Sequence, residues 1–167
     1  MALIVELLAD HHDRPGFACE NPEFADYLRA RARRDRDAGV AACFVLVDQA
    51  SSSVVLGYYT LSSFTVELGS LPDDYRKKAR LPRYPEVPAT LIGRLARVVD
   101  GKGLGHVLLV DALQRAAVMS RQVASHAVIV DAIDANAVAF YLRYGFFAIP
   151  GGSQTRLILP MTAAAKL

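Results

Sequence analysis

The amino-acid sequence predicts a mixed α/β fold in which one central sheet is flanked by helices. Segments with strand-like and helix-like patterns follow one another in the order strand, helix, three strands, helix, strand, helix and two strands. The chain has 167 residues, which suits a single domain that covers residues 1–167. Its composition is 53% hydrophobic and 22% charged, which favours a globular core and argues against disorder.

The N-terminal part of the chain predicts a strand and then a long helix. Leu3–Leu8 is the first apolar run. Asn21-Pro22 is typical of a helix N-terminus, and we expect the helix to run from about Glu23 to Ala38 and to stop at Gly39. The apolar residues that share one face of this helix, and that we expect to be buried, are Phe24, Tyr27 and Leu28.

The middle of the chain predicts strands and one long loop. Segments rich in branched and aromatic residues are the expected strands Ala41–Val47, Val54–Phe64 and Thr90–Val99. Before the last of them lies Leu71–Val87, which is polar, basic and interrupted by prolines. We expect a surface loop there, with a short helix near Asp73–Lys78, and loops of this length are often functional.

The C-terminal part predicts two helices, a strand and a hairpin. Gly103–Met119 has a helical composition with apolar residues around most of its circumference, so we expect it to be well buried. Val123–Ala132 has the pattern of a buried strand. Asp134 can cap a helix that ends at Tyr144, with Gly145 just beyond it. The final expected hairpin joins Phe146–Ile149 to Thr155–Leu159 through Gly151-Gly152.

Bulk properties exclude several classes of protein. No apolar run approaches the roughly 18 residues that cross a bilayer, and the apolar start lacks a basic leader and is interrupted by Glu6. The two cysteines, Cys19 and Cys43, are expected to be reduced thiols of a soluble cytoplasmic protein. No group of histidines, cysteines and carboxylates has metal-ligand spacing, so we expect no metal. The net charge of +2 does not by itself require a nucleic-acid partner.

A glycine-rich segment between a predicted strand and a predicted helix is typical of a phosphate-binding loop. The segment is Gly101-Lys102-Gly103-Leu104-Gly105-His106. Glycines allow a sharp turn and a close approach of the backbone, and the first amides of a helix point at an anion. A P-loop is excluded because no Lys-Ser/Thr pair follows the last glycine. A dinucleotide fingerprint is excluded because Leu108 stands where glycine or alanine is needed. A tight turn without a ligand is the alternative.

Together with Asp134–Phe146, which ends in Tyr141-Leu142-Arg143-Tyr144-Gly145-Phe146, this loop resembles the GNAT superfamily of acyl-CoA-dependent N-acyltransferases. The resemblance covers nearly the whole chain. It implies a mostly antiparallel central sheet, acetyl-CoA as the acyl donor, and Tyr141 as the acid that protonates the coenzyme thiolate. The coenzyme-binding residues that it implies are Leu95, Ala96, Arg97, Val98, Gly101, Lys102, Gly103, Leu104, Gly105, His106 and Asn136.

Three further segments resemble the GNAT toxins of bacterial toxin–antitoxin pairs. They are Phe17–Glu20, Gly57–Leu61 and Arg83–Ala96, together with the basic helix that follows Tyr27-Leu28. This resemblance implies a toxin that acetylates the α-amino group of aminoacyl-tRNA and so blocks translation. It also implies a ribbon-helix-helix antitoxin as the partner protein.

The reaction chemistry is consistent with an α-amine as acceptor. A phenol with a reference pKa of about 10 can donate a proton to a thiolate of pKa near 8.5 in a closed site. No general base stands out, since Glu67 and Glu86 are more simply surface carboxylates. An α-amine of pKa about 7.7–8.0 needs a base less than a lysine amine does.

Two basic clusters are candidates for RNA contact. Five arginines crowd the first helix, where aspartates offset part of their charge. The second cluster lies in the proline-bounded loop and has no acid between its basic residues. The residues that we expect to contact tRNA are Arg33, Arg36, Arg76, Lys77, Lys78 and Arg83. A homodimer would widen such a surface.

Asp100 leaves alternatives open. It stands where the superfamily commonly has glutamine or arginine, and its carboxylate would repel a pyrophosphate. One alternative is therefore a coenzyme-binding module with weakened catalysis. The other is a GNAT enzyme that acetylates a small-molecule amine or a protein N-terminus, which would not need the two basic clusters.

Overall fold

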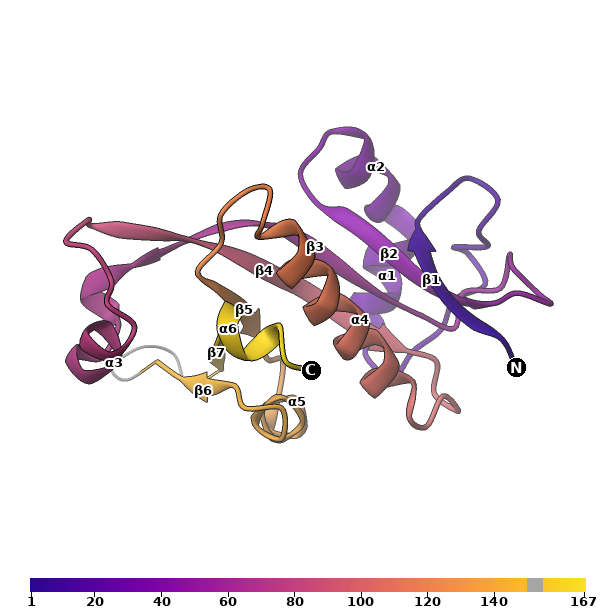
Figure 1. Cartoon of the computed structure of the whole chain (residues 1–167). Coiled ribbons are helices and arrows are strands. Elements are labelled where there is room, and N and C mark those ends of the chain that lie inside the picture. The colour runs from indigo at the N-terminus through magenta and orange to yellow at the C-terminus, as the bar shows by residue number, and fades with distance from the viewer. Residues whose placement is uncertain (150–154) are drawn as a thin grey trace. The chain divides into compact units, whose positions relative to one another are not determined.

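The computed structural model of the chain describes residues 1–149 and 155–167 (Figure 1). The strands are β1 (Leu3–Leu7), β2 (Ala42–Asp48), β3 (Gly57–Glu67), β4 (Glu86–Arg97), β5 (Ala127–Asp131), β6 (Phe147–Ala148) and β7 (Arg156–Pro160). The α-helices are α1 (Pro22–Ala30), α2 (Ala32–Asp37), α3 (Asp73–Lys78), α4 (Leu104–Met119), α5 (Ala135–Leu142) and α6 (Met161–Ala164), and a 3₁₀ turn η1 covers Leu68–Ser70. The expected mixed α/β fold is confirmed.

The strands form one seven-stranded sheet in the order β1-β2-β3-β4-β5-β7-β6. The pairings β1–β2, β2–β3, β5–β7 and β6–β7 are antiparallel. The chain forms two compact units. The first contains residues 1–62 and 92–112, and the second contains residues 63–91 and 113–167.

The core of the first unit lies where α1 and the start of α2 pack on β2. Leu28 and Ala32 are fully buried there, in the same cluster as Val45 and Val47. Strand β2 is buried on both faces, because the alternate residue Phe44 stacks on Tyr59 at 5.2 Å between ring centroids. The burial of β2 and of the first four residues of β3 gives the first unit a rigid platform for β4 and for the loop that follows it.

The long helix expected over residues 23–38 is instead two short helices. The chain breaks at Arg31, whose backbone has φ −123° and ψ −28°. The break allows the Tyr27 hydroxyl to donate a 2.7 Å hydrogen bond to Asp35. Residues eight apart in an unbroken helix are about 12 Å apart along its axis. The periodicity of apolar residues along the sequence does not report such a tertiary contact.

The start of the first helix was predicted correctly. The Asn21 side chain accepts hydrogen bonds from the amides of Glu23 and Phe24.

Helix α4 is buried along one face and not around most of its circumference. The buried residues on this face are Leu108, Leu109, Ala112, Leu113, Ala116 and Ala117. Val118 and Met119 are exposed, which corrects the expectation of an all-round buried helix. Small alanine side chains form much of the buried face near the C-terminal end of the helix. Apolar residues outside that face can remain exposed to solvent at a moderate cost in free energy.

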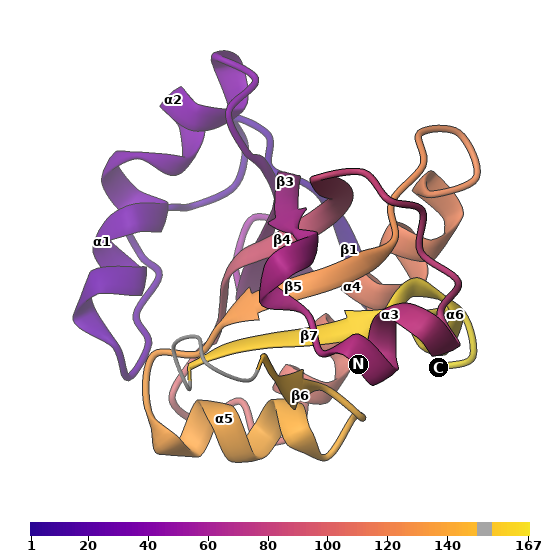
Figure 2. The ribbon, with the colours of Figure 1, turned by 90° about the vertical axis from the view of Figure 1, so that its left-hand side faces the viewer.

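The core of the second unit gathers side chains from β3, β4, β5 and β7. Ile129 and Ile158 are fully buried and lie opposite each other in the β5–β7 register. Figure 2 shows β5, β7 and β6 of this unit together with α3 and α5. Helix α3 covers the residues expected for a short helix. No described helix is long and apolar enough to span a membrane.

Two boundaries in the second unit differ from the sequence expectation. Strand β5 begins at Ala127 and not at Val123, which is 72% exposed. The His126 amide donates to Pro88 O at 2.8 Å. Backbone hydrogen bonding to the neighbouring strand therefore begins only at His126, directly before β5. Helix α5 ends at Leu142 and not at Tyr144, and Gly145 follows with a positive φ of 96°. The final hairpin pairs β6 with β7, while the proposed turn residues Gly151-Gly152 lie outside the described residues.

Candidate coenzyme and RNA sites

The glycine-rich loop forms a tight turn between β4 and α4 in the first unit. The Gly101 amide donates to Val98 O at 2.9 Å, and the Leu104 amide donates to Gly101 O at 3.0 Å. A Cβ atom on Gly101 would lie 2.7 Å from Leu104 Cδ1 and 3.0 Å from Val98 O. A larger residue at Gly101 would therefore force Leu104 and the bend at Val98 to shift. Gly103 has φ +84°, a left-handed conformation that glycine adopts without strain.

The loop presents amides to solvent at the N-terminus of α4. Within the described part of the chain, the amides of Gly103 and Gly105 have no hydrogen-bond acceptor. Lys102 and Gly103 are exposed. Unsatisfied amides at the start of a sixteen-residue helix, with the helix dipole behind them, form a favourable site for a phosphate. The Lys102 ammonium group adds a positive charge on the same turn.

The strand that leads into the loop is held by its own side chains. Arg97 donates to Val98 O at 3.1 Å and to Val99 O at 3.0 Å. The guanidinium thus stabilises the carbonyls of this bend and brings a positive charge to the loop. The Val98 amide donates to Leu56 O at 2.9 Å, so it is already satisfied. Val98 is among the expected coenzyme-binding residues, but its amide is therefore not free to polarise a thioester carbonyl.

Asp100 lies exposed beside Gly101. Its charge opposes that of Lys102 on the same short loop. The carboxylate therefore reduces the positive potential at the turn that carries the free amides.

Tyr141 lies in the second unit, on the buried side of α5. Asp134 caps this helix through a 2.8 Å hydrogen bond from the Ala137 amide. The Tyr141 ring is 7% exposed and packs against Phe140 and Phe146 at centroid distances of 5.2 Å and 5.4 Å. Burial raises the pKa of Tyr141 above its usual value near 10. The phenol is therefore protonated throughout the physiological pH range, as a proton donor must be. Asn136, in the first turn of α5, is exposed.

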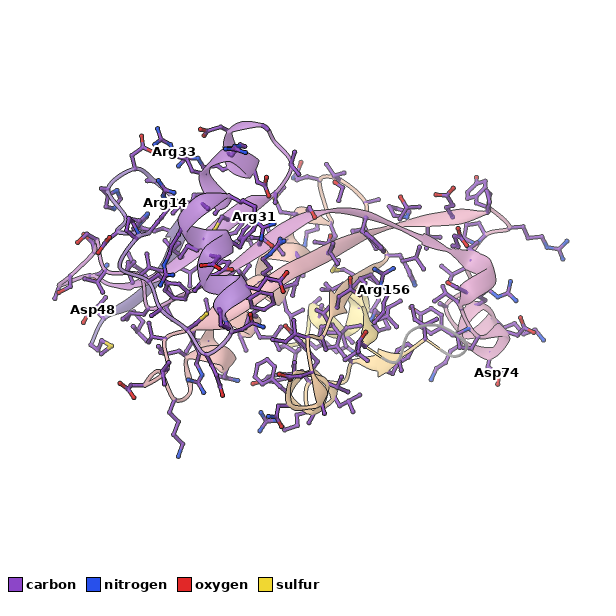
Figure 3. The ribbon with its side chains drawn as sticks, turned by 180° about the vertical axis from the view of Figure 1, so that it is seen from behind. Arg14, Arg31, Arg33, Asp48, Asp74 and Arg156 are labelled. Atoms are coloured by element: carbon purple, nitrogen blue, oxygen red, sulfur yellow. The ribbon has the colours of Figure 1, made fainter. Side chains whose placement is uncertain are left out.

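The two arginines proposed for RNA contact in α2 have different environments. Arg36 donates to Leu8 O at 2.9 Å and pairs with Asp10 at 3.3 Å and with Asp37 at 2.9 Å. Hydrogen bonds to these aspartates raise the pKa of Arg36. Arg33 lies more loosely, 3.7 Å from Asp10, with 54% of its side chain exposed (Figure 3). Arg33 is therefore available to an external partner, whereas Arg36 has a structural role.

The second basic cluster lies on and after α3, in the second unit. Asp73, in the first turn of α3, forms an ion pair with Arg76 (i, i+3). The sequence had no acid between the basic residues, but helix geometry brings this flanking acid onto one of them. Lys77, Lys78 and Arg83 are exposed. Arg80, which belongs to the expected basic cluster, is also exposed. Tyr84 is exposed beside it and was not among the expected RNA-contact residues, because the sequence pattern does not report exposure.

Three potential metal ligands, Glu6, His11 and His12, meet in the first unit although their spacing gave no signal. The buried His12 accepts a hydrogen bond at Nδ1 from the Ala9 amide at 2.9 Å. Its Nε2 lies 2.8 Å from Glu6 and must therefore carry the proton. Both ring nitrogens are occupied, so His12 serves as a structural link and cannot coordinate a metal in this arrangement.

Both cysteines are free thiols. Burial raises the pKa of Cys43 to about 12 and also raises that of Cys19. Neither thiol is suited to nucleophilic catalysis at neutral pH.

Comparison with known proteins places these features in context. No family model matches the chain. The tRNA-acetylating toxin of Mycobacterium tuberculosis is 32% identical over 162 residues, which cover 96% of this chain and 93% of that protein. The structure of a tyrosine-to-phenylalanine mutant of KacT matches with a TM-score of 0.89 and 29% identity, covering 99% of both chains.

Several similar structures of AtaT contain tRNA or acetyl-CoA. AtaT complexed with acetyl-methionyl-tRNAfMet matches with a TM-score of 0.87 and 27% identity, covering 96% of both chains. AtaTR bound with AcCoA matches with a TM-score of 0.84 and 26% identity, covering 98% of this chain and 96% of that one.

Proposed function

Because this chain belongs to the family of GNAT acetyltransferase toxins that includes the tRNA-acetylating toxin, we propose that it transfers an acetyl group from acetyl-CoA to the α-amino group of aminoacyl-tRNA and so blocks translation. The observation that carries this proposal is the glycine-rich loop at the start of α4. Its amides, the left-handed Gly103 and Lys102 together suit a pyrophosphate. Arg97 and His106 flank the same turn.

The chemistry requires a neutral amine, a polarised thioester carbonyl and a proton for the departing sulfur. The α-amino nitrogen attacks the carbonyl carbon, the carbon–sulfur bond breaks, and the amine loses a proton to solvent. We assign to Tyr141 the donation of a proton to the sulfur. The Tyr141 phenolate then recovers a proton from solvent. Amides of the Leu95–Arg97 stretch would polarise the carbonyl, and Asn136 would bond the pantetheine arm. This division of roles needs no metal.

The acceptor RNA is a polyanion, and the two basic clusters suit it. Arg33 is exposed on α2, and Lys77, Lys78 and Arg83 are exposed in the second unit. Lysines and arginines that neutralise phosphates release counterions, which supplies affinity without sequence specificity. Arg76 would join them once its pairing with Asp73 yields to a phosphate.

The proposed function includes a protein partner, a dimeric state, a cellular location and a single-domain organisation. A ribbon-helix-helix antitoxin would bind and inhibit the protein, and a homodimer would extend the RNA-binding surface. The protein would act in the cytoplasm, where charged tRNA is found. Strands β3 and β4 and helix α4 each contribute residues to both compact units, which supports treating residues 1–167 as one acetyltransferase domain.

A transfer assay tests the function. The purified protein is incubated with labelled acetyl-CoA and charged total tRNA, and acid-insoluble label is counted before and after nuclease digestion. Label that chromatographs as N-acetylaminoacyl-adenosine is the expected product. Deacylated tRNA and tRNA whose α-amine is chemically blocked serve as controls and should remain unlabelled. Label that appears only on polyamines, peptides or protein N-termini would overturn the proposal in favour of another GNAT acceptor.

Asp100 opposes a pyrophosphate, so the assay must also distinguish an active enzyme from a module that only binds the coenzyme. Binding of acetyl-CoA without transfer to any acceptor would identify a coenzyme-binding module and would also contradict the proposed function. Calorimetry with acetyl-CoA, measured on the same preparation, separates loss of coenzyme binding from loss of transfer.

A further inference from the structure

A basic hollow with a volume of about 730 Å³ lies on the second unit, between α3 and the start of β4. The charged and aromatic residues that line it are Asp73, Arg76, Lys77, Arg80, Arg83 and Tyr84. Four cationic side chains therefore face one carboxylate, and that carboxylate already pairs with Arg76. Arg76 Nε has no hydrogen-bond acceptor among the described residues. The hollow has the charge of an anion site, and the guanidinium group of Arg76 within it is incompletely satisfied.

The backbone at Arg80 indicates that its side chain is needed there. Arg80 has φ +53°, the one non-glycine residue with a positive φ in the described part of the chain. Its amide donates to Lys77 O at 3.1 Å, and the Leu81 amide donates to Arg76 O at 3.1 Å. These two bonds form the helix-ending motif whose left-handed position glycine usually occupies. An arginine at this positive φ is strained, whereas a glycine would adopt the same conformation without strain. Such strain points to a role for the arginine side chain.

Tyr84 is displayed at the edge of the same hollow. Its side chain is 68% exposed, although it is a large aromatic residue. Pro85 follows it and restricts its backbone to extended conformations. Pro85 O also accepts a 3.0 Å hydrogen bond from the Leu68 amide, which fastens this segment to the end of β3. The ring is therefore held outward on a stiff segment, as a stacking platform requires.

We infer that this hollow binds an unpaired nucleotide of the acceptor RNA, with a phosphate on the arginines and the base stacked on Tyr84. A basic groove beside an exposed aromatic ring is the combination that recognises single-stranded nucleic acid. The unpaired segment at the 3′ end of a charged tRNA, next to the acceptor stem, has this chemistry. The inference rests on the proposed function. It adds Tyr84 as a residue that recognises single-stranded RNA rather than a duplex.

Base stacking is tested with two RNA hairpins that differ only at the 3′ end. One ends in a short single-stranded overhang that contains 2-aminopurine, and the other is blunt. Tyr84→Ala should lower affinity for the overhang hairpin by about 5- to 100-fold and abolish quenching of 2-aminopurine fluorescence. Affinity for the blunt hairpin should be nearly unchanged. Tyr84→Phe keeps the ring and should bind both hairpins like the wild type. Equal affinity of Tyr84→Ala and wild type for the overhang hairpin would overturn the inference.

Arg80→Gly separates a binding role from a structural one. Glycine relieves the left-handed strain, so the thermal midpoint should stay the same or rise. Affinity for the overhang hairpin should fall, and the slope of log affinity against log salt should decrease by about one. Arg121→Ala is the matched control, because it removes an exposed charge of the same unit outside the hollow. A lower midpoint with unchanged RNA affinity in Arg80→Gly would contradict the assigned role.

Failure of the inference and failure of the proposed function give different results. The hairpins are uncharged and binding is measured without acetyl-CoA, so the test does not depend on catalysis. Full acetyl transfer to charged tRNA by Tyr84→Ala, with unchanged affinity, would refute the inference and leave the proposed function intact. Binding of poly-glutamate in place of the overhang hairpin would assign the hollow to an acidic protein segment and would overturn the inference.

Discussion

The Tyr75 hydroxyl lies 2.6 Å from His126 Nε2, which connects α3 to the residue that precedes β5. The two rings meet edge to face at a centroid distance of 5.7 Å, and Tyr75 also packs near Phe147 at 5.6 Å. This contact holds the short basic helix on the core of the second unit. The local position of Arg76 and Lys77 depends on it.

The contact should make stability depend on pH. Burial lowers the pKa of His126 below its usual value of 6.5. Below about pH 6.5 the unfolded chain binds a proton at His126 before the folded chain does, so folding stability falls as the pH drops through this range. We expect the thermal midpoint of the wild type to fall more between pH 7.5 and 5 than that of His126→Gln, by about 2 °C. Equal pH dependence of both proteins would contradict a neutral, half-buried His126 in the folded protein.

Replacement of Tyr141 by phenylalanine should impair turnover and spare coenzyme binding. The substitution removes the proton donor but keeps the ring that packs on Phe140 and Phe146. We expect kcat to fall about a hundredfold or more while the Kd for acetyl-CoA changes little. Tyr144→Phe is the control and should retain activity. Full activity in Tyr141→Phe would require another proton donor.

Gly103 permits a substitution series that separates backbone strain from bulk. A Cβ at Gly103 meets no atom within 4 Å, so only the left-handed φ of 84° opposes a side chain. Asparagine tolerates this conformation and a β-branched residue does not. Coenzyme affinity should therefore fall modestly in Gly103→Asn and at least about tenfold in Gly103→Val. The reverse order, measured by calorimetry, would show that the loop does not need this conformation.

Removal of the charge at Asp100 should strengthen coenzyme binding. The carboxylate is exposed on the glycine-rich loop, where it opposes a pyrophosphate. For exposed charges the gain is small, and we expect Asp100→Asn to raise affinity about two- to fivefold at low salt and less at high salt. Asp48→Asn removes a half-buried carboxylate at the end of β2 in the first unit and should have no effect on coenzyme affinity (Figure 3). An equal response of both variants would show a nonspecific effect of net charge.

Arg33 and Arg36 should respond differently to alanine substitution. Arg36→Ala leaves Leu8 O without its donor and breaks contacts with Asp10 and Asp37, so the thermal midpoint should fall by several degrees. Arg33→Ala should leave the midpoint within about 1 °C. Its effect should instead be a smaller salt dependence of tRNA binding, with the slope reduced by about one. Similar thermal losses in both variants would contradict the different roles.

Features that depend on a few neighbouring residues were predictable from the sequence. Asn21 and Asp134 cap helices as expected, and Asp73–Lys78 is a helix. Gly145 has the positive φ that is common for a glycine after a helix, and Gly103 has a positive φ within the expected sharp turn. Such features follow from local backbone preference, because a cap or a left-handed turn restricts which residue types fit.

Contacts between distant residues were decided by the tertiary structure alone. The sequence pattern was continuous across Arg31, yet the helix breaks there and Tyr27 reaches Asp35. Arg36 looked equivalent to Arg33 until packing placed Leu8 O within its reach. The sequence by itself determined the fold class, the glycine-rich loop and the family resemblance. Which charged and aromatic side chains remain available to RNA was decided by tertiary structure, since burial and partners depend on segments that the chain brings together only when it folds.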